Sequence, residues 1–226
     1  MRNAAGVSRK AAPASDLISR ERLRAAVLYV ITPDAEPEQV LGIAEAAQRG
    51  GADAVQLRQK ILVRGELLAL ARRMREVLHD ALFIVNDHVD IALLSGADGV
   101  HLGQDDLSVA SARKVGGDAM IIGASASSVD AARMAVAAGA DYIGSGPAFS
   151  TPIKAKKQVI GPQGVAEIAK ALGAGVPVFA IGGVDAMNIA ELTAAGVYRA
   201  CVIREVANAK DPEQATRRLR AMLSPR

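Results

Sequence analysis

The sequence predicts a single-domain α/β protein, a (β/α)8 TIM barrel, from its apolar runs and its composition. Eight short apolar runs alternate with helix-like segments along the 226 residues, and this alternation is typical of a closed parallel barrel. Half of the residues are apolar but only 3% are aromatic, which suits helices packed closely on a sheet. An open doubly wound sheet is the competing fold, but the first run ends in Ile31-Thr-Pro-Asp34, which is not a glycine-rich dinucleotide-binding turn.

An internal repeat marks several of the strand starts. Gly51-Ala-Asp53, Gly96-Ala-Asp98 and Gly139-Ala-Asp141 recur at spacings of 45 and 43 residues, and a degenerate fourth copy starts at Gly196. Each copy follows a helix-like segment and precedes an apolar run, as expected where a helix ends at glycine and a strand begins.

The predicted elements follow from these signals in chain order. The repeat copies introduce four apolar runs, which start at residues 54, 99, 142 and 200. The other four runs are residues 27–31, 81–85, 120–122 and 176–181. Apolar side chains at helical spacing predict helices between them over residues 38–49, 64–78, 129–138 and 163–172.

The positive charge of the chain is concentrated at its N-terminus. The net charge is +3, and the first 24 residues hold six basic and two acidic side chains. We therefore expect residues 1–24 to form a basic extension that ends in a short helix packed on the core, with a transit peptide as the alternative, and residues 25–226 to form the barrel. The nearly neutral core indicates no nucleic-acid partner.

The same composition limits where the protein works and how it is held together. No apolar run reaches the roughly 18 residues that span a bilayer, so we expect a cytoplasmic protein with no membrane partner. The single cysteine, Cys201, lies in an apolar run and is expected to be a buried small residue.

Polar side chains occupy alternate positions along the second predicted strand. Gln56, Arg58 and Lys60 are separated by single residues, so on a strand they project from the same face. An amide and two cations on one face suit a phosphate or pyrophosphate group. The alternative is a strand end at which Arg58 and Lys60 are hydrated.

The ends of the other strands also carry polar or small residues. In a barrel of parallel strands, the carboxyl ends meet at one face, where active sites are found. The residues at these ends are Asn86, Asp87, Gln104, Asp106, Ser125, Thr151, Lys154, Gly182, Gly183, Ile203 and Arg204.

These strand ends resemble those of the thiamin phosphate synthase family, which shares its barrel with the thiazole tautomerases. The matching pieces run in order from about residue 28 to the C-terminus, and together they are far more specific than any one of them. They are Leu28-Tyr-Val-Ile-Thr32, Gln56-Leu-Arg-Gln-Lys60, Val85-Asn-Asp87, Ala97-Asp-Gly-Val-His-Leu-Gly-Gln-Asp-Asp106, Ile122-Gly-Ala-Ser125, Ala140-Asp-Tyr-Ile-Gly-Ser-Gly-Pro147, Thr151, Lys154 and Ala180-Ile-Gly-Gly-Val184.

The resemblance implies a transferase of thiamin biosynthesis that joins a pyrimidine pyrophosphate to a thiazole phosphate through a pyrimidine cation. Its substrates would be small molecules, and relatives are often homo-oligomers, although the sequence leaves the oligomeric state open. The implied catalytic residues are Arg58, Lys60, Asn86, Ser125 and Lys154. Further substrate contacts are implied for Gln56, Gln104, Thr151, Gly182, Gly183, Ile203 and Arg204.

A magnesium ion is the cofactor that the resemblance implies. Asp87 and Asp106 follow neighbouring strands, and Mg²⁺ prefers carboxylate and phosphate oxygens. The structural alternative for Asp87 is a turn or a helix N-cap before His88, and the alternative for Asp106 is a helix N-cap before Leu107 and Ser108.

Three positions bear on which member of the family the chain resembles. Ser127 stands where the tautomerases have the histidine that transfers the proton, so a synthase is favoured over a tautomerase. Ile153 and Arg204 also depart from the usual synthase pattern. They leave open a barrel that binds thiazole or thiamin phosphate without catalysis.

Overall fold

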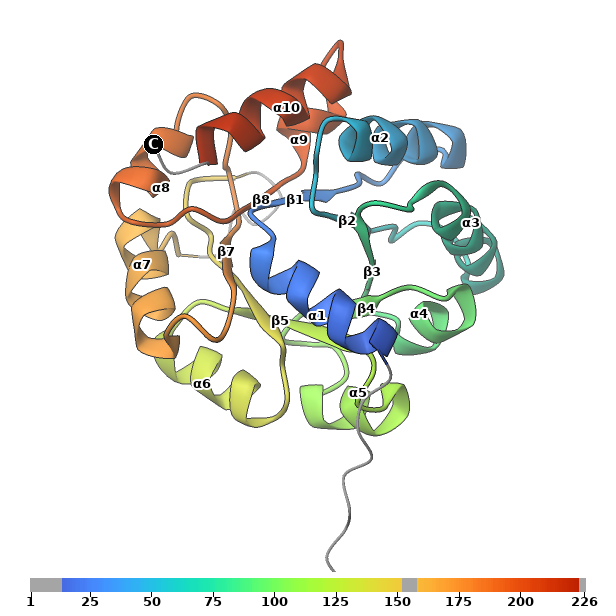
Figure 1. Ribbon diagram of the computed structural model, residues 1–226, viewed down its shortest axis with the longest axis horizontal. Helices are drawn as coiled ribbons and strands as arrows, with labels where there is room; N and C mark the ends of the chain where they lie inside the picture. The colour runs from blue at the N-terminus through green and yellow to red at the C-terminus, as the bar shows by residue number, and fades with distance from the viewer. Residues whose placement is uncertain (1–13, 152–157, 224–226) are drawn as a thin grey trace, which may run out of the picture.

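The computed structural model describes residues 14–151 and 158–223, which form a closed barrel of eight parallel strands (Figure 1). The strands follow one another around the barrel in sequence order, and β8 pairs with β1 to close it. The TIM-barrel prediction is therefore confirmed. The strands are β1 (Leu28–Ile31), β2 (Ala54–Leu57), β3 (Leu82–Asn86), β4 (Gly99–Leu102), β5 (Ile121–Ala126), β6 (Tyr142–Ser145), β7 (Val178–Ala180) and β8 (Ala200–Val202).

Helices surround the barrel in the order expected for a β/α repeat (Figure 1). The four predicted helices are α2, α3, α6 and α7, and their observed ends lie within two residues of the predicted ones. The helices are α1 (Ala14–Ala25), α2 (Pro37–Arg49), α3 (Arg64–Val77), α4 (Val89–Ser95), α5 (Val109–Gly116), α6 (Val129–Ala137), α7 (Gly161–Leu172), α8 (Ile189–Ala194), α9 (Arg204–Ala207) and α10 (Pro212–Leu223).

The strands are buried on both faces, which explains why they appear in the sequence as continuous apolar runs. In β1, Leu28 and Val30 pack against the surrounding helices, whereas Tyr29 belongs to the cluster that fills the barrel interior. Three aromatic rings dominate this interior, and Phe179 packs edge-on against both tyrosines with ring centroids 5.6 Å from Tyr29 and 5.8 Å from Tyr142. The interior is therefore a packed core rather than a channel.

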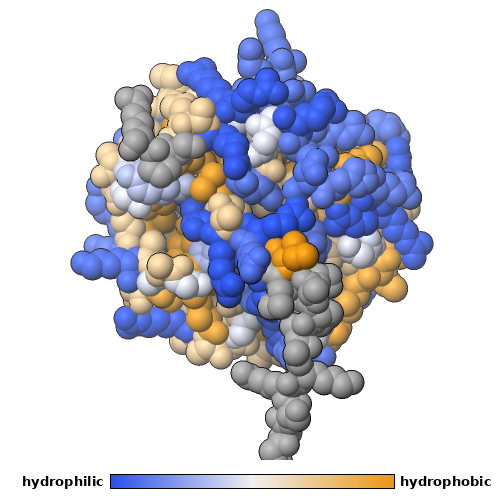
Figure 2. All heavy atoms as spheres, in the orientation of Figure 1, coloured by the Kyte–Doolittle hydropathy of each residue, from blue (hydrophilic) through white to orange (hydrophobic). Residues whose placement is uncertain are grey.

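Helix α1 lies across the end of the barrel at which the strands begin (Figure 1). Leu23 inserts into the interior cluster, Ser19 donates a hydrogen bond to Asp98, and Arg20 forms an ion pair with Asp141. Figure 2 shows this face, where hydrophilic residues gather over the helix. Most of the predicted N-terminal extension, residues 1–13, lies outside the described residues, so the division at residue 24 stays a prediction.

The aspartates of the internal repeat fasten the strands together at this end. One carboxylate oxygen of Asp98 accepts the backbone N–H of Phe83 at 2.8 Å, and Arg75 pairs with the same oxygen at 3.0 Å. Asp141 accepts from Ile122 in the same way, and Asp53 accepts from Leu28. The repeat therefore encodes more than a helix–strand junction, because each aspartate joins the start of its strand to the strand before it.

Replacing Asp98 with alanine is expected to lower the free energy of unfolding by about 2–4 kcal/mol, because it leaves the buried Phe83 N–H and the Arg75 guanidinium without this partner. Chemical denaturation measures the change. The control is Asp130→Ala at an exposed position of α6, which should cost less than about 1 kcal/mol. Equal losses in the two variants would contradict this role for the repeat.

Candidate active site

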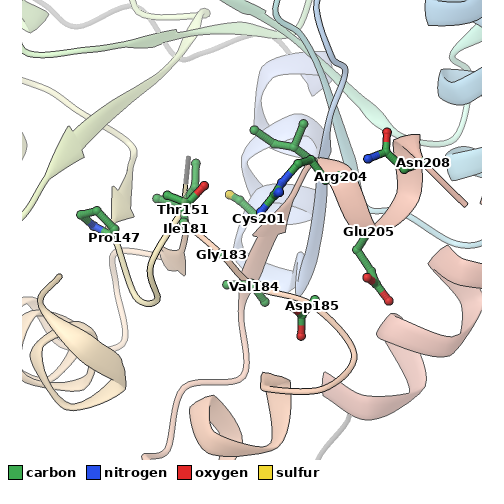
Figure 3. Close-up of a pocket in the computed structure, with 12 residues that line it drawn as sticks. Pro147, Thr151, Ile181, Gly183, Val184, Asp185, Cys201, Arg204, Glu205 and Asn208 are labelled. Carbon is green, nitrogen blue, oxygen red and sulfur yellow. The ribbon is translucent and has the colours of Figure 1, made fainter. Parts of the chain in front are cut away.

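Two adjoining cavities open at the carboxyl ends of the strands. The central pocket has a volume of about 290 Å³ and is lined by residues that lie in or just after each of the eight strands. The β7–β8 pocket has a volume of about 320 Å³ and is lined by residues that follow β6, β7 and β8 (Figure 3). Ile181, Cys201 and Ile203 line both cavities, so two ligands bound side by side would meet there.

The structure brings most of the predicted site residues into one or other cavity. Ile203 lies in both, whereas Lys154 lies outside the described residues and its role stays a prediction. The β7–β8 pocket contains Thr151, Gly182, Gly183 and Arg204. The central pocket contains Gln56, Arg58, Lys60, Asn86, Asp87, Gln104, Asp106 and Ser125.

Gln56, Arg58 and Lys60 do not form a continuous strand face, because only Gln56 lies within β2. The strand ends at Leu57, one residue before Arg58, because the chain turns there onto the β1–α2 loop. In that loop Asp34 forms an ion pair with Arg58 at 2.6 Å and accepts the backbone N–H of Lys60 at 2.6 Å. Gln56, Arg58 and Lys60 nevertheless all reach the central pocket. Asp34, which the sequence did not single out, holds the Arg58 guanidinium and the backbone of Lys60 in place.

Asp87 and Asp106 face each other beside Lys60. Burial of Asp87, together with its hydrogen bond to Asp106 and the charge of that carboxyl, raises the pKa of Asp87, and the Lys60 ammonium at 3.3 Å only partly opposes this. Asp87 also has a left-handed backbone, with φ at 66°, which few residues other than glycine, asparagine and aspartate tolerate. A cation bound between the two carboxyls would relieve the repulsion that disfavours the charged form of Asp87.

Neither aspartate caps a helix. Asp106 Oδ2 accepts the backbone N–H of Gly103 at 2.7 Å within its own loop, and Ser108 caps α5 by accepting from the N–H of Ser111. Helix α4 begins after His88 without a side-chain cap. The N-cap alternative for Asp106 is therefore wrong, because the helix starts two residues later than that alternative requires.

A metal ion at these carboxylates would need further ligands. Within residues 14–151 and 158–223, no group of three or more histidine, cysteine, aspartate or glutamate side chains is arranged to hold a metal ion. Two carboxylates therefore fit Mg²⁺ when water and substrate oxygens complete its coordination.

Within the same described ranges, no helix is long and apolar enough to cross a membrane.

The β7–β8 pocket is built around two glycines with positive φ, 96° at Gly182 and 69° at Gly183. A Cβ at Gly182 would lie 2.8 Å from Pro147, and one at Gly183 would lie 2.6 Å from the Ser150 carbonyl oxygen. Only glycine therefore lets the β7 loop pack this closely against the β6 loop. The exposed backbone that results can approach an anion closely.

Arg204 opens α9 beside this pocket. Its side chain runs toward Cys201 in the close-up, while Glu205 lies on the other side of the backbone (Figure 3). The guanidinium is exposed and adds positive charge at the pocket wall.

A chain of buried hydrogen bonds, which the sequence did not reveal, lies beneath the central pocket. It joins Gln56 to Ser125 through Tyr29, Tyr142 and His101. The sequence contains one signal for it, since tyrosine and histidine are uncommon among the apolar residues of a barrel interior. Their contacts could not be read from sequence, because Tyr29 and Tyr142 are 113 residues apart.

The chain is similar to known thiamine-phosphate synthases over most of its length. A family described as thiamine monophosphate synthase matches residues 28–206. A curated thiamine-phosphate synthase of Gloeobacter violaceus is 44% identical over 87% of this chain, and one of Chlorobium luteolum is 45% identical over 88%. The chain spans 57% of the length of the first relative and 93% of the second.

A solved structure agrees with these matches. The thiamine phosphate pyrophosphorylase of Pyrococcus furiosus aligns with a TM-score of 0.79 and 37% identity, covering 90% of this chain and 96% of its own. A 3-hexulose-6-phosphate synthase aligns with a TM-score of 0.71 at 21% identity, which shows a shared fold alone.

Proposed function

Because the chain belongs to the thiamine monophosphate synthase family, we propose that it is a transferase of thiamin biosynthesis that joins hydroxymethylpyrimidine pyrophosphate to thiazole phosphate. The observation that carries this proposal is the pair of adjoining pockets. One gathers cations and carboxylates suited to a pyrophosphate, and the other offers glycine backbone and an arginine suited to a phosphate. A site for two phosphorylated substrates fits a joining reaction better than a one-substrate reaction.

The proposed reaction exchanges one bond for another. The bond between the pyrimidine methylene carbon and the pyrophosphate oxygen breaks, and its electron pair leaves with the pyrophosphate. The resulting pyrimidine-methyl cation is captured by the lone pair of the thiazole nitrogen, which forms thiamin phosphate. The closed barrel supports this order, because the cation would lie over a packed aromatic core that excludes water from below.

The residues of the central pocket divide this work. Arg58 and Lys60 would take up the charge that develops on the leaving pyrophosphate, and Asn86 would donate a further hydrogen bond. Their ion pairs with Asp34 and Asp87 hold the cations toward the pocket before substrate arrives. Lys154, which lies outside the described residues, is predicted to contribute a further cation to the pyrophosphate.

Asp87 and Asp106 would hold the Mg²⁺ ion that the family resemblance implies. When bound, the ion would add positive charge to the pyrophosphate oxygens. The raised pKa of Asp87 supports this assignment, since burial and the neighbouring Asp106 carboxyl disfavour the charged form of Asp87, and a bound cation would offset both effects.

The second substrate would bind in the β7–β8 pocket. Backbone groups near Gly182 and Gly183, with Thr151 and Arg204, would hold the thiazole phosphate, which is the usual place for phosphate in this fold. Ile203 lies in both pockets and would separate the two rings. Gln56, Gln104 and Ser125 would contact the pyrimidine.

Two alternatives predict different products. A thiazole tautomerase would need a base at position 127, where this chain has an exposed serine. A binding barrel would hold the thiazole phosphate without turnover.

The cytoplasmic location and the homo-oligomeric state stay predictions.

The test mixes the purified protein with both substrates and Mg²⁺ and follows release of pyrophosphate and formation of thiamin phosphate. We expect both products in equal amounts and neither without the protein. Binding of thiazole phosphate without product would support the binding barrel, and rapid isomerisation of a thiazole carboxylate phosphate would support the tautomerase. Either result would overturn the proposed function.

A further inference from the structure

Five polar side chains form one continuous hydrogen-bonded chain through the barrel interior. Gln56 Nε2 donates to the Tyr29 hydroxyl at 2.9 Å, and the Tyr29 and Tyr142 hydroxyls lie 3.0 Å apart. The Tyr142 hydroxyl lies 3.1 Å from His101 Nδ1, and His101 Nε2 lies 3.0 Å from Ser125 Oγ. Gln56 and Ser125, at the two ends, both line the central pocket.

The barrel is shaped to hold this chain. Its three middle members are no more than 9% exposed, and the His101 and Tyr142 rings pack with centroids 5.5 Å apart. Glycines occupy the strand positions beside them. A Cβ at Gly123 would lie 2.0 Å from the Tyr142 ring, and a Cβ at Gly144 would lie 3.0 Å from the His101 ring.

The hydrogens in this chain have a preferred order. Burial raises the pKa of both Tyr29 and Tyr142, so each hydroxyl keeps its single hydrogen. The Tyr29 hydroxyl accepts a hydrogen bond from Gln56. Its own hydrogen is used within the hydrogen-bonded chain when the Tyr29 hydroxyl donates to the Tyr142 hydroxyl. Tyr142 then donates to His101 Nδ1, and the opposite ring nitrogen of His101 donates to Ser125 Oγ. Every hydrogen between Gln56 and Ser125 is used in this order.

The order fixes what each end presents to a ligand. Gln56 uses an N–H inside the chain and leaves its carbonyl oxygen as an acceptor. Ser125 receives a hydrogen bond from His101, so its own O–H is left as a donor. The pocket thereby offers an acceptor at β2 and a donor at β5. The character of these two groups is set by Tyr29, Tyr142 and His101, of which Tyr142 does not line the pocket.

We infer that Tyr29, Tyr142 and His101 are positioning residues that make the central pocket selective for an aminopyrimidine. Such a ring carries an amino donor on one side and a ring nitrogen acceptor on the other, which complements Gln56 and Ser125. A ring with an oxo group in place of the amino group presents an acceptor where the pocket already has one. This inference deepens the proposed function and rests on it for the identity of the substrate.

The test measures binding rather than turnover, using 4-amino- and 4-oxo-pyrimidine methyl phosphates in calorimetry. Wild-type protein should prefer the amino compound by about tenfold or more. Tyr142→Phe cuts the chain at its centre and should reduce this preference to about threefold or less, while the affinity for inorganic pyrophosphate stays within about twofold. Tyr29→Phe, measured in parallel, should do the same, and it carries the test if Tyr142→Phe does not fold.

A matched control is Tyr198→Phe, which removes a hydroxyl from a surface tyrosine outside both pockets and should leave the preference unchanged. Folded variants that weaken both compounds equally would overturn the inference, because a structural role alone would then explain the loss. The proposed function fails separately, if wild-type protein shows the preference but forms no thiamin phosphate.

Discussion

Replacing Arg58 with alanine is expected to lower kcat/KM for the pyrimidine pyrophosphate by about 10²–10³-fold, with little loss of stability. The guanidinium lies in the central pocket beside Lys60 and is held there by Asp34. Charge on the leaving pyrophosphate grows as the carbon–oxygen bond breaks, so a cation placed in advance stabilises the transition state more than the bound substrate. Steady-state kinetics with saturating thiazole phosphate measures the effect.

Two further variants show whether the charge itself is responsible. Arg58→Lys keeps the charge but loses the planar guanidinium that binds two oxygens at once, so it should recover part of the activity. Arg133→Ala removes an exposed arginine of α6 that lines neither pocket and should leave kcat/KM unchanged. Near-normal turnover in Arg58→Ala would show that the pyrophosphate leaves without help from this side chain.

The strands could be predicted from sequence because each is a short apolar run bounded by glycine or by polar residues. The same pattern placed Arg58, Asp87 and Ser125 at the strand ends, and barrel closure then brought them into one pocket. The prediction was wrong where it extended the β2 strand as far as Lys60, since local alternation does not reveal where a strand leaves the sheet.

The missing parts of the site are pairings between distant residues. Asp34 was overlooked because its partner Arg58 lies on another strand loop, 24 residues away. The repeat copies Gly51-Ala-Asp53 and Gly96-Ala-Asp98 were visible in the sequence. However, the backbone N–H groups that donate hydrogen bonds to their aspartates belong to neighbouring strands. Such partners are fixed by strand register around the closed barrel, and register is a property of the whole fold.

Replacing Asp87 with asparagine is expected to lower activity by about 10²-fold or more and yet to stabilise the protein in the absence of metal. The amide keeps the shape of the side chain and tolerates the left-handed backbone at this position, but it is a poor magnesium ligand. Activity is measured across a Mg²⁺ titration. In thermal unfolding, addition of Mg²⁺ and pyrophosphate should raise the Tm of the wild-type protein and leave the Tm of the variant nearly unchanged.

The gain in stability follows from the raised pKa of Asp87. The folded protein holds this proton more tightly than the unfolded chain, in which an aspartate has a pKa of about 3.9. The contribution of Asp87 to stability is therefore complete below that value and is lost as the pH rises through the raised folded value. An asparagine cannot lose a proton, so Asp87→Asn escapes this loss at neutral pH.

Unfolding in EDTA at two pH values separates this effect from any other change. At pH 7 the variant should be more stable than wild-type protein, and below about pH 4 the two should converge, because the wild-type carboxyl is then protonated in both states. Asp130→Asn, at an exposed position of α6, serves as the matched control and should show no such convergence. A variant that is less stable than wild type at pH 7 but converges with it below about pH 4 would mean that the ion pair between Asp87 and Lys60 outweighs the cost of burying the Asp87 charge, and that the metal site is held together before any metal binds.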